Sequence, residues 1–196
     1  MNFVAAQDFI LKKMEDELPG HLFYHGLHHT RDVYSAAVNI AKEEGITSSV
    51  ELALIKTATL YQDSGFTIDY KNHEESGCDL ARKTLPGFGY TSEHIEVICG
   101  MIMATKIPQN PQNKLEEILC DADLDYLGRD DFYEIGDTLF SELKFYNKIK
   151  DEQQWNKIQV SFLNAHHYYT NYGKVHREAQ KQVYLKDLIK VIETYK

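Results

Sequence analysis

The feature that most constrains how this chain can fold is an apolar stretch that runs into a carboxylate. Residues 54–66 have the sequence Leu-Ile-Lys-Thr-Ala-Thr-Leu-Tyr-Gln-Asp-Ser-Gly-Phe. The apolar side chains before Gln62 predict a buried helix, and Gly65 is placed to end it. A carboxylate at the end of such a helix is costly unless something pairs with it. Asp63 therefore predicts a polar site around which the other helices must pack.

Apolar residues recur at helical spacing along the chain, and no segment alternates as a strand would. The pattern predicts an all-α fold of about eight or nine helices, with His21 to His29 as a loop and Thr30 as a helix cap. The expected helices are residues 2–18, 30–45, 48–65 and 73–85, one from residue 91 or 92 that ends before the loop 106–113, residues 115–127, one from residue 130 or 131, and residues 151–173 and 174–194.

Length and charge narrow the class of protein. The 196 residues favour a single domain, residues 1–196, with a sizeable core. The net charge of −9 comes from acidic residues spread along the chain, which argues against a general nucleic-acid binder. The acidic N-terminal segment indicates neither a signal peptide nor a membrane span, so we expect a cytoplasmic protein. Three cysteines without Cys-x-x-Cys spacing are expected to be buried, reduced thiols.

A histidine cluster precedes the apolar stretch, and a run of aspartates follows it. The upstream cluster is His21, His25, His28 and His29, and the downstream run is Asp121, Asp123 and Asp125. Imidazole and carboxylate groups are the usual ligands of divalent metal ions. The pattern predicts a metal site centred on Asp63, with ligands from three distant helices.

Four motifs resemble those of the HD-domain phosphohydrolases, an all-α, metal-dependent superfamily. They are Tyr24-His25-x-x-x-His29-Thr30, Leu60-Tyr61-Gln62-Asp63-Ser64-Gly65-Phe66, His73-Glu74-Glu75 and Asp121-Ala122-Asp123-Leu124. The spacing of Trp155, Gln159 and Phe162 is also similar to bacterial members, so the resemblance covers most of the chain. The family binds its metal through a histidine, an adjacent His-Asp pair and a distant aspartate. The resemblance therefore implies a single HD-domain helical bundle in which His29, Asp63 and Asp123 are ligands.

Two positions refine this expected ligand set. Asp123 is favoured over Asp121 because the family's aspartate usually follows an alanine and precedes a leucine-containing turn. Residues two apart on a helix also point to opposite sides. Gln62 stands where the family has histidine, and its amide oxygen is a harder, weaker ligand than imidazole. The set His29, Gln62, Asp63 and Asp123 therefore favours weakly held Mn²⁺ or Mg²⁺, with Fe²⁺, Co²⁺, Ni²⁺ or Zn²⁺ as alternatives.

The resemblance implies a metal-dependent phosphohydrolase that acts on a small phosphorylated compound, with a nucleotide as one candidate. In such an enzyme the ion activates water and polarises a phosphoryl oxygen. Asp63 would also orient or deprotonate the water, and His73 would transfer protons or contact the phosphate. His25, Lys106 and Arg129 would balance the phosphate charge.

Each of these residues also has a simpler interpretation. His73 could be an exposed first-turn side chain, and Lys106 and Arg129 could be cations favoured near helix ends. The alternative function is a sensor module that keeps the HD fold and a weak metal or nucleotide site without turnover. Gln62 is the residue that divides these two functions.

Overall fold

The computed structural model describes residues 1–195, and that range is helical with no strand. Its ten α-helices are α1 (Phe3–Glu17), α2 (Leu27–Glu43), α3 (Ser49–Gln62), α4 (His73–Thr84), α5 (Ser92–Ala104), α6 (Lys114–Asp123), α7 (Phe132–Phe145), α8 (Glu152–Ala165), α9 (Asn171–His176) and α10 (Glu178–Glu193). Three 3-10 helices join them: η1 (Asp63–Thr67), η2 (Leu85–Phe88) and η3 (Asp125–Gly128). The predicted all-α class is confirmed, with one helix more than the predicted eight or nine.

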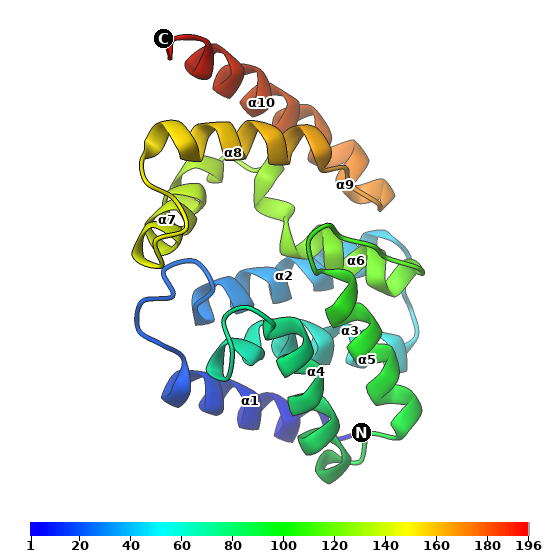
Figure 1. Cartoon of the computed structure of the whole chain (residues 1–196). Helices are drawn as coiled ribbons and strands as arrows, with labels where there is room; N and C mark the ends of the chain where they lie inside the picture. The colour runs from blue at the N-terminus through cyan, green and yellow to red at the C-terminus, as the bar shows by residue number, and fades with distance from the viewer. Residues whose placement is uncertain (196) are drawn as a thin grey trace.

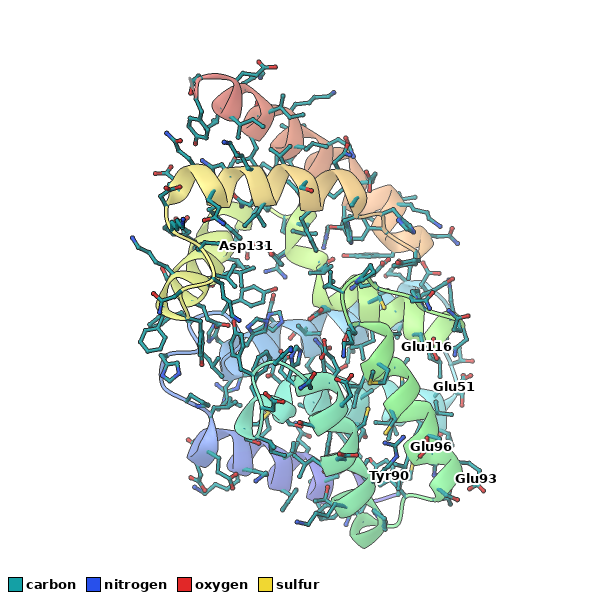
Figure 2. The ribbon with its side chains drawn as sticks, viewed as in Figure 1. Glu51, Tyr90, Glu93, Glu96, Glu116 and Asp131 are labelled. Carbon is teal, nitrogen blue, oxygen red and sulfur yellow. The ribbon has the colours of Figure 1, made fainter. Side chains whose placement is uncertain are left out.

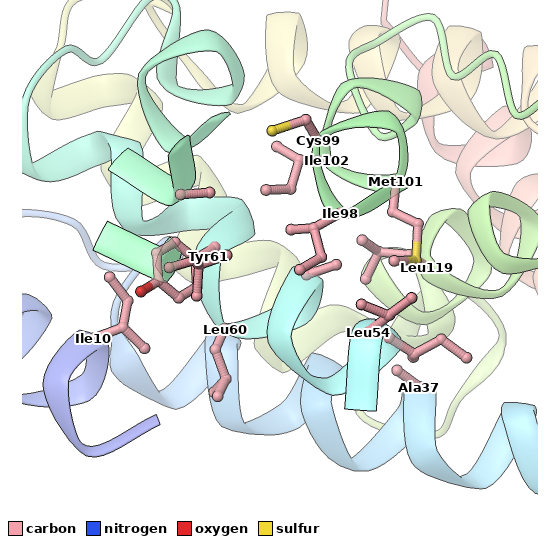
Figure 3. Close-up of a cluster of buried hydrophobic side chains, with 14 of the residues drawn as sticks. Ile10, Ala37, Leu54, Leu60, Tyr61, Ile98, Cys99, Met101, Ile102 and Leu119 are labelled. Atoms are coloured by element: carbon pink, nitrogen blue, oxygen red, sulfur yellow. The ribbon is translucent and has the colours of Figure 1, made fainter. Parts of the chain in front are cut away.

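The helices gather around two buried apolar clusters (Figure 1). The larger cluster is built by α1 to α6, with α3 in its middle, where it packs against all five of the others. Figure 3 shows side chains of α1, α2, α5 and α6 gathered around α3, among them Ile10, Ala37, Ile98 and Leu119. Burial of this apolar surface is the main force that holds α3 in place. The end of α3, where the polar residues lie, is therefore positioned by the core.

The smaller cluster is built by α7, α8, α10 and η3, in the upper half of Figure 1. Phe132 stacks on Tyr184 with ring centroids 4.6 Å apart, and α8 packs along α10. Leu163 and Leu185 close the space between them. Two groups of helices thus face each other, and the polar ends of α2, α3 and α6 lie between them.

Helix α2 begins earlier than predicted. The loop expected to reach His29 ends at Gly26, and Thr30 lies buried inside the helix instead of capping it. The carbonyl of Gly26 accepts hydrogen bonds from the backbone N–H groups of His29 and Thr30 at 3.0 and 3.3 Å, which closes the first turn. His29 is therefore held on a helix, a more rigid support than a loop.

The predicted role of Gly65 is wrong. Helix α3 ends at Gln62, and Gly65 lies in the 3-10 turn η1 without the positive φ of a helix-ending glycine. A Cβ at residue 65 would lie 1.8 Å from the carbonyl oxygen of His73. The absence of a side chain allows η1 to lie directly against the start of α4. This close approach brings the side chains of Asp63 and His73 near each other.

The helix predicted over residues 151–173 is two helices. Helix α8 ends at Ala165, and His166 has extended backbone. The carboxylate of Asp121 accepts hydrogen bonds from the backbone N–H groups of Tyr169 and Thr170, both at 2.9 Å. The hydroxyl of Thr170 then accepts from the N–H of Gly173 and caps α9. A buried carboxylate has therefore taken the N–H groups that a continuous helix would need.

The surface and the cysteines agree with the composition. No helix within residues 1–195 is long and apolar enough to cross a bilayer. Acidic side chains are distributed over several elements, as Figure 2 shows for Glu51, Glu93, Glu96, Glu116 and Asp131. Cys78, Cys99 and Cys120 are buried free thiols, as predicted.

Candidate metal centre

Three side chains that are far apart in sequence meet between the two groups of helices. His29 Nε2 lies 3.5 Å from Asp63 Oδ2 and 3.2 Å from Asp123 Oδ1. His29 is in the first turn of α2, Asp63 follows the last residue of α3, and Asp123 ends α6. Packing of α2 against both α3 and α6 aligns these ends. Helix C-termini carry partial negative charge, so two of the three supporting ends favour a cation.

Gln62 completes the group but faces it with its N–H₂. This residue ends α3 and is 3% exposed. Its Nε2 donates a hydrogen bond to Asp123 Oδ1, while its Oε1 is buried without a hydrogen-bond partner among the described residues. Leaving such an oxygen unpaired costs about 1–3 kcal/mol. Rotation of the amide by half a turn exchanges its oxygen and nitrogen, and a cation beside Asp123 would favour the oxygen there.

The charge state of His29 follows from its neighbours. Burial acts to lower the pKa of His29, but the hydrogen bond with Asp123 and the charges of Asp63 and Asp123 outweigh it and raise that pKa. When it is protonated, His29 offsets one of the two carboxylate charges. Within residues 1–195, no three His, Cys, Asp or Glu side chains already surround one point as metal ligands. The donors fit an ion chemically once His29 is neutral and the Gln62 amide has turned.

His73 and Glu74 extend the site from the first turn of α4. His73 Nε2 lies 3.9 Å from Asp63 Oδ1 and 3.4 Å from Glu74 Oε1. The ring of Phe66 stacks on His73 with centroids 4.0 Å apart, and His25 lies 4.5 Å from the same ring. His73 is thus turned toward Asp63 and away from the exposed position that its place in the sequence also allowed.

Glu142 is a residue of the site that our sequence analysis missed. His25 Nδ1 lies 2.6 Å from Glu142 Oε1, and Glu142 Oε2 accepts hydrogen bonds from the backbone N–H groups of Tyr24 and His25 at 2.8 and 3.1 Å. The hydroxyl of Tyr70 donates to Glu142 Oε1 at 3.2 Å. A signal was present: residue 142 falls on the apolar face of its helix, in register with Ile135 and Leu139.

The ionisation of Glu142 fixes the tautomer of His25. Burial acts to raise the pKa of Glu142, but the hydrogen bond and charge of His25 and the two backbone N–H donors outweigh it, so the pKa is lowered. An ionised carboxylate accepts the proton on His25 Nδ1. In the neutral ring, Nε2 is then left free to accept a proton from a ligand.

A cavity of about 420 Å³ opens beside this group. Its polar end is lined by Tyr24, His25, Gln62, Asp63, His73, Glu74, Thr105 and Asp123. Its other end is lined mainly by apolar side chains of η3, α7 and α8, together with Ile107 and Leu124. The polar side chains are therefore placed to act on a molecule bound in the cavity.

The two predicted phosphate-binding cations do not line the cavity. Lys106 forms an ion pair with Glu75 on the outer side of α4. Arg129 lies 2.9 Å from Asp32 and 2.7 Å from Asp131. Both side chains are already paired with carboxylates, so these contacts place them away from a phosphate in the cavity.

The neighbouring aspartates also have other partners. Asp121 is fully buried and accepts hydrogen bonds from Tyr169 and Thr170, away from His29. Asp125 pairs with Arg177 at 2.8 Å. Of the three aspartates in this run, only Asp123 faces His29 within the described structure.

No protein family, curated protein or solved structure matches this chain. What the chain does must therefore be inferred from its own residues.

Proposed function

We propose that this chain is an HD-type, divalent-metal-dependent phosphohydrolase that acts on a small phosphorylated compound. The observation that carries this proposal is the contact of His29 with Asp63 and Asp123, the two carboxylates that line the polar end of a cavity. Clustered carboxylate and imidazole groups at the bottom of a cavity are typical of hydrolytic metal sites.

His29 Nε2, the carboxylates of Asp63 and Asp123 and the Gln62 amide oxygen would hold the ion. One nitrogen and three oxygens favour Mn²⁺ or Mg²⁺, and the neutral amide makes retention weak. When bound, a divalent ion supplies Lewis acidity to the phosphoryl oxygens and to water. The unpaired Gln62 oxygen supports a ligand role for this residue.

The protons of the reaction can be assigned to protein groups. Hydrolysis joins a water oxygen to phosphorus and breaks the bond from phosphorus to the ester oxygen. The attacking water must lose one proton and the departing alcohol must gain one. We assign the first proton to Asp63, and His73, whose Nε2 lies 3.9 Å from Asp63 Oδ1, would receive it. His25, whose Nδ1 is held by Glu142 Oε1 at 2.6 Å, would deliver the second proton from Nε2.

One observation favours the sensor as a second candidate. The Gln62 amide presents N–H₂ to Asp123, and no lysine or arginine from residues 1–195 lines the cavity. A site in this state would bind an ion or ligand with little stabilisation of the charge on a transferred phosphoryl group.

The test is phosphate release from a panel of phosphomonoesters and nucleotides with added Mn²⁺, Mg²⁺, Co²⁺ or Ni²⁺. We expect metal-dependent release that Asp63→Asn abolishes, while Asp8→Asn, an exposed change on α1 outside the cavity, leaves it intact. Metal binding without release of phosphate from any compound would favour the sensor. Absence of both binding and release would contradict the metal site itself.

A further inference from the structure

The apolar end of the cavity is deep and continuous with the candidate metal centre. Phe132, Trp155 and Leu163 form its buried wall, each at most 6% exposed. Leu139 and Leu143 of α7 are half-buried and line the same space. An apolar surface this close to a polar site is stabilised by a ligand that covers it.

Few groups at this end could recognise a polar molecule. The polar side-chain groups there are the amide of Gln159, the indole N–H of Trp155 and the hydroxyl of Tyr126. The backbone groups of α7 and α8 are used within their helices. A nucleobase would leave several ring and exocyclic groups without partners, at a cost for each one. A hydrocarbon has no such groups.

The charges at the polar end limit the head group. Asp63, Glu74 and Asp123 line it, and the nearby cations Lys106 and Arg129 are paired elsewhere. A triphosphate would bring several negative charges to a site that no lysine or arginine of residues 1–195 lines. A single phosphate brings at most two negative charges, which one divalent ion can balance.

From these observations we propose that the ligand of this cavity is a phosphate monoester whose organic part is a hydrocarbon chain or ring. The phosphate lies at the His29–Asp63–Asp123 end and the hydrocarbon lies against α7 and α8. The identity of the head group rests on the proposed function, whereas the hydrocarbon part rests on the cavity wall. Ile107 and Ile158 line the cavity and are 54% and 39% exposed, which places its opening between the segment after α5 and the outer face of α8.

Trp155 provides a direct measurement, because it lines the cavity and is the one tryptophan of the chain. The probes are n-alkylphosphonates from methyl to octyl, which have no ester bond to hydrolyse, in the presence of Mg²⁺. Binding is followed by tryptophan emission and checked by calorimetry. We expect the Kd to fall by about fourfold for each added methylene until the cavity is filled. Adenosine monophosphate should bind no more tightly than methylphosphonate.

A matched pair of variants locates the hydrocarbon. Leu139→Asn should weaken hexylphosphonate binding at least tenfold and leave methylphosphonate binding unchanged. Val183→Asn makes the same kind of change on the exposed face of α10, outside the cavity, and should alter neither. Leu143→Asn serves the same purpose if the first variant is unfolded by circular dichroism.

The outcomes separate this inference from the proposed function. A Kd that does not depend on chain length overturns the hydrocarbon assignment, even if some nucleotide is hydrolysed. A chain-length dependence that Leu139→Asn removes supports the assignment, even if no alkyl phosphate is hydrolysed with any metal. In that last case the phosphohydrolase proposal alone would be wrong.

Discussion

Gln62 is the residue that most affects the chemistry of the site. Its amide now donates to Asp123, while its oxygen has no partner among residues 1–195. Replacing it with histidine substitutes a nitrogen donor of similar reach with little change in volume. We expect Gln62→His to raise the affinity for Mn²⁺ or Co²⁺ by about tenfold, or about 1.4 kcal/mol. Calorimetric titration measures this directly.

The rate of phosphate release distinguishes the two candidate functions in the same variant. If metal retention limits turnover, occupancy and rate rise together in Gln62→His. If the protein is a sensor, occupancy rises and the rate stays at background. Gln62→Leu is the control, since it removes both polar atoms and should weaken binding. Equal metal affinity in the wild type and Gln62→His would show that residue 62 is not a ligand.

Glu142 positions the His25 ring through its contact with Nδ1. Glu142→Gln keeps an oxygen for the backbone N–H groups of Tyr24 and His25 but removes the charge that holds the imidazole proton. We expect a loss of about 1–3 kcal/mol in the free energy of unfolding and a fall of about 10–100-fold in kcat with little change in KM. Tyr70→Phe removes only the hydroxyl contact at 3.2 Å and should have a much smaller effect.

The pH dependence of stability gives Glu142 a second signature. Its pKa is lower in the folded than in the unfolded chain, because the donors around it outweigh its burial. The stability it contributes is therefore fully present above the unfolded pKa of about 4.3 and is lost as pH falls through the folded pKa. Urea unfolding from pH 7 to pH 3 should show a shallower acid-side loss in Glu142→Gln than in the wild type. Identical curves would mean that Glu142 is not ionised in the fold.

At the scale of elements, Gly65 determines how η1 meets α4. A Cβ there would lie 1.8 Å from the His73 carbonyl oxygen and 2.7 Å from the Gly77 nitrogen, both backbone atoms. We expect Gly65→Ala to destabilise the fold by about 3 kcal/mol and to separate Asp63 from His73. Gly87→Ala is the matched control, since nothing lies within 4 Å of its added Cβ. Urea unfolding of both variants measures the difference, and equal midpoints would contradict this account.

The junction after α8 should also lose stability as pH falls, but from a higher pH than Glu142. Burial, and then the charge of Lys181, lowers the pKa of His166 to about 3. His166 is therefore neutral in the fold, and it protonates more readily in the unfolded chain. Its effect on stability is absent above the unfolded pKa of about 6.5. As pH falls from there toward 3, stability drops by up to about 1.4 kcal/mol per pH unit.

His166→Asn should remove that slope between pH 6 and pH 4. His167→Asn, the exposed neighbour in the same junction, should keep it. Denaturant midpoints across this pH range provide the measurement. A slope that is unchanged in His166→Asn would show that this histidine is already charged in the fold.

Some elements were predictable from the sequence because their causes are local. Helix α3 follows from its apolar run, and the ends of the first two helices follow from Pro19-Gly20 and Gly45, which has a φ of 77°. Asp123 could be chosen over Asp121 from helix periodicity and the resemblance. The break after Ala165 could not be predicted, because it depends on Asp121 capturing N–H groups from a segment distant in sequence.

In the site, too, some features follow from local sequence and others depend on contacts between distant segments. His29, Gln62, Asp63 and Asp123 form a recognisable pattern in the sequence, and the structure brings them together. Their roles as metal ligands stay a prediction. The pairing of Lys106 with Glu75 and the contact of Glu142 with His25 arise only when α4, α5 and α7 are placed in space. Composition and spacing do not show which carboxylate pairs with a given cation in the folded protein.

At the scale of the whole molecule, the cavity joins the two groups of helices. Its polar end is lined mainly by the α1–α6 group and its apolar end mainly by α7 and α8. Figure 1 shows α7 and α8 above α2 and α3. The candidate ligands of the ion all come from the first group. Metal and hydrocarbon should therefore stabilise different parts of the chain, and hydrogen exchange can separate them.

We expect Mg²⁺ alone to slow amide exchange at the ends of α2, α3 and α6 and to leave α7 and α8 unchanged. Adding hexylphosphonate at 100 times its Kd should slow exchange in α7 and α8 as well, and raise the free energy of unfolding by about 2.7 kcal/mol. Helix α1 lines no part of the cavity and serves as the internal reference. Methylphosphonate at matched occupancy has no hydrocarbon to reach α7 and α8, so it should protect only the first group. Protection of α7 and α8 by methylphosphonate, or none by hexylphosphonate, would show that the apolar end does not hold the organic part of the ligand.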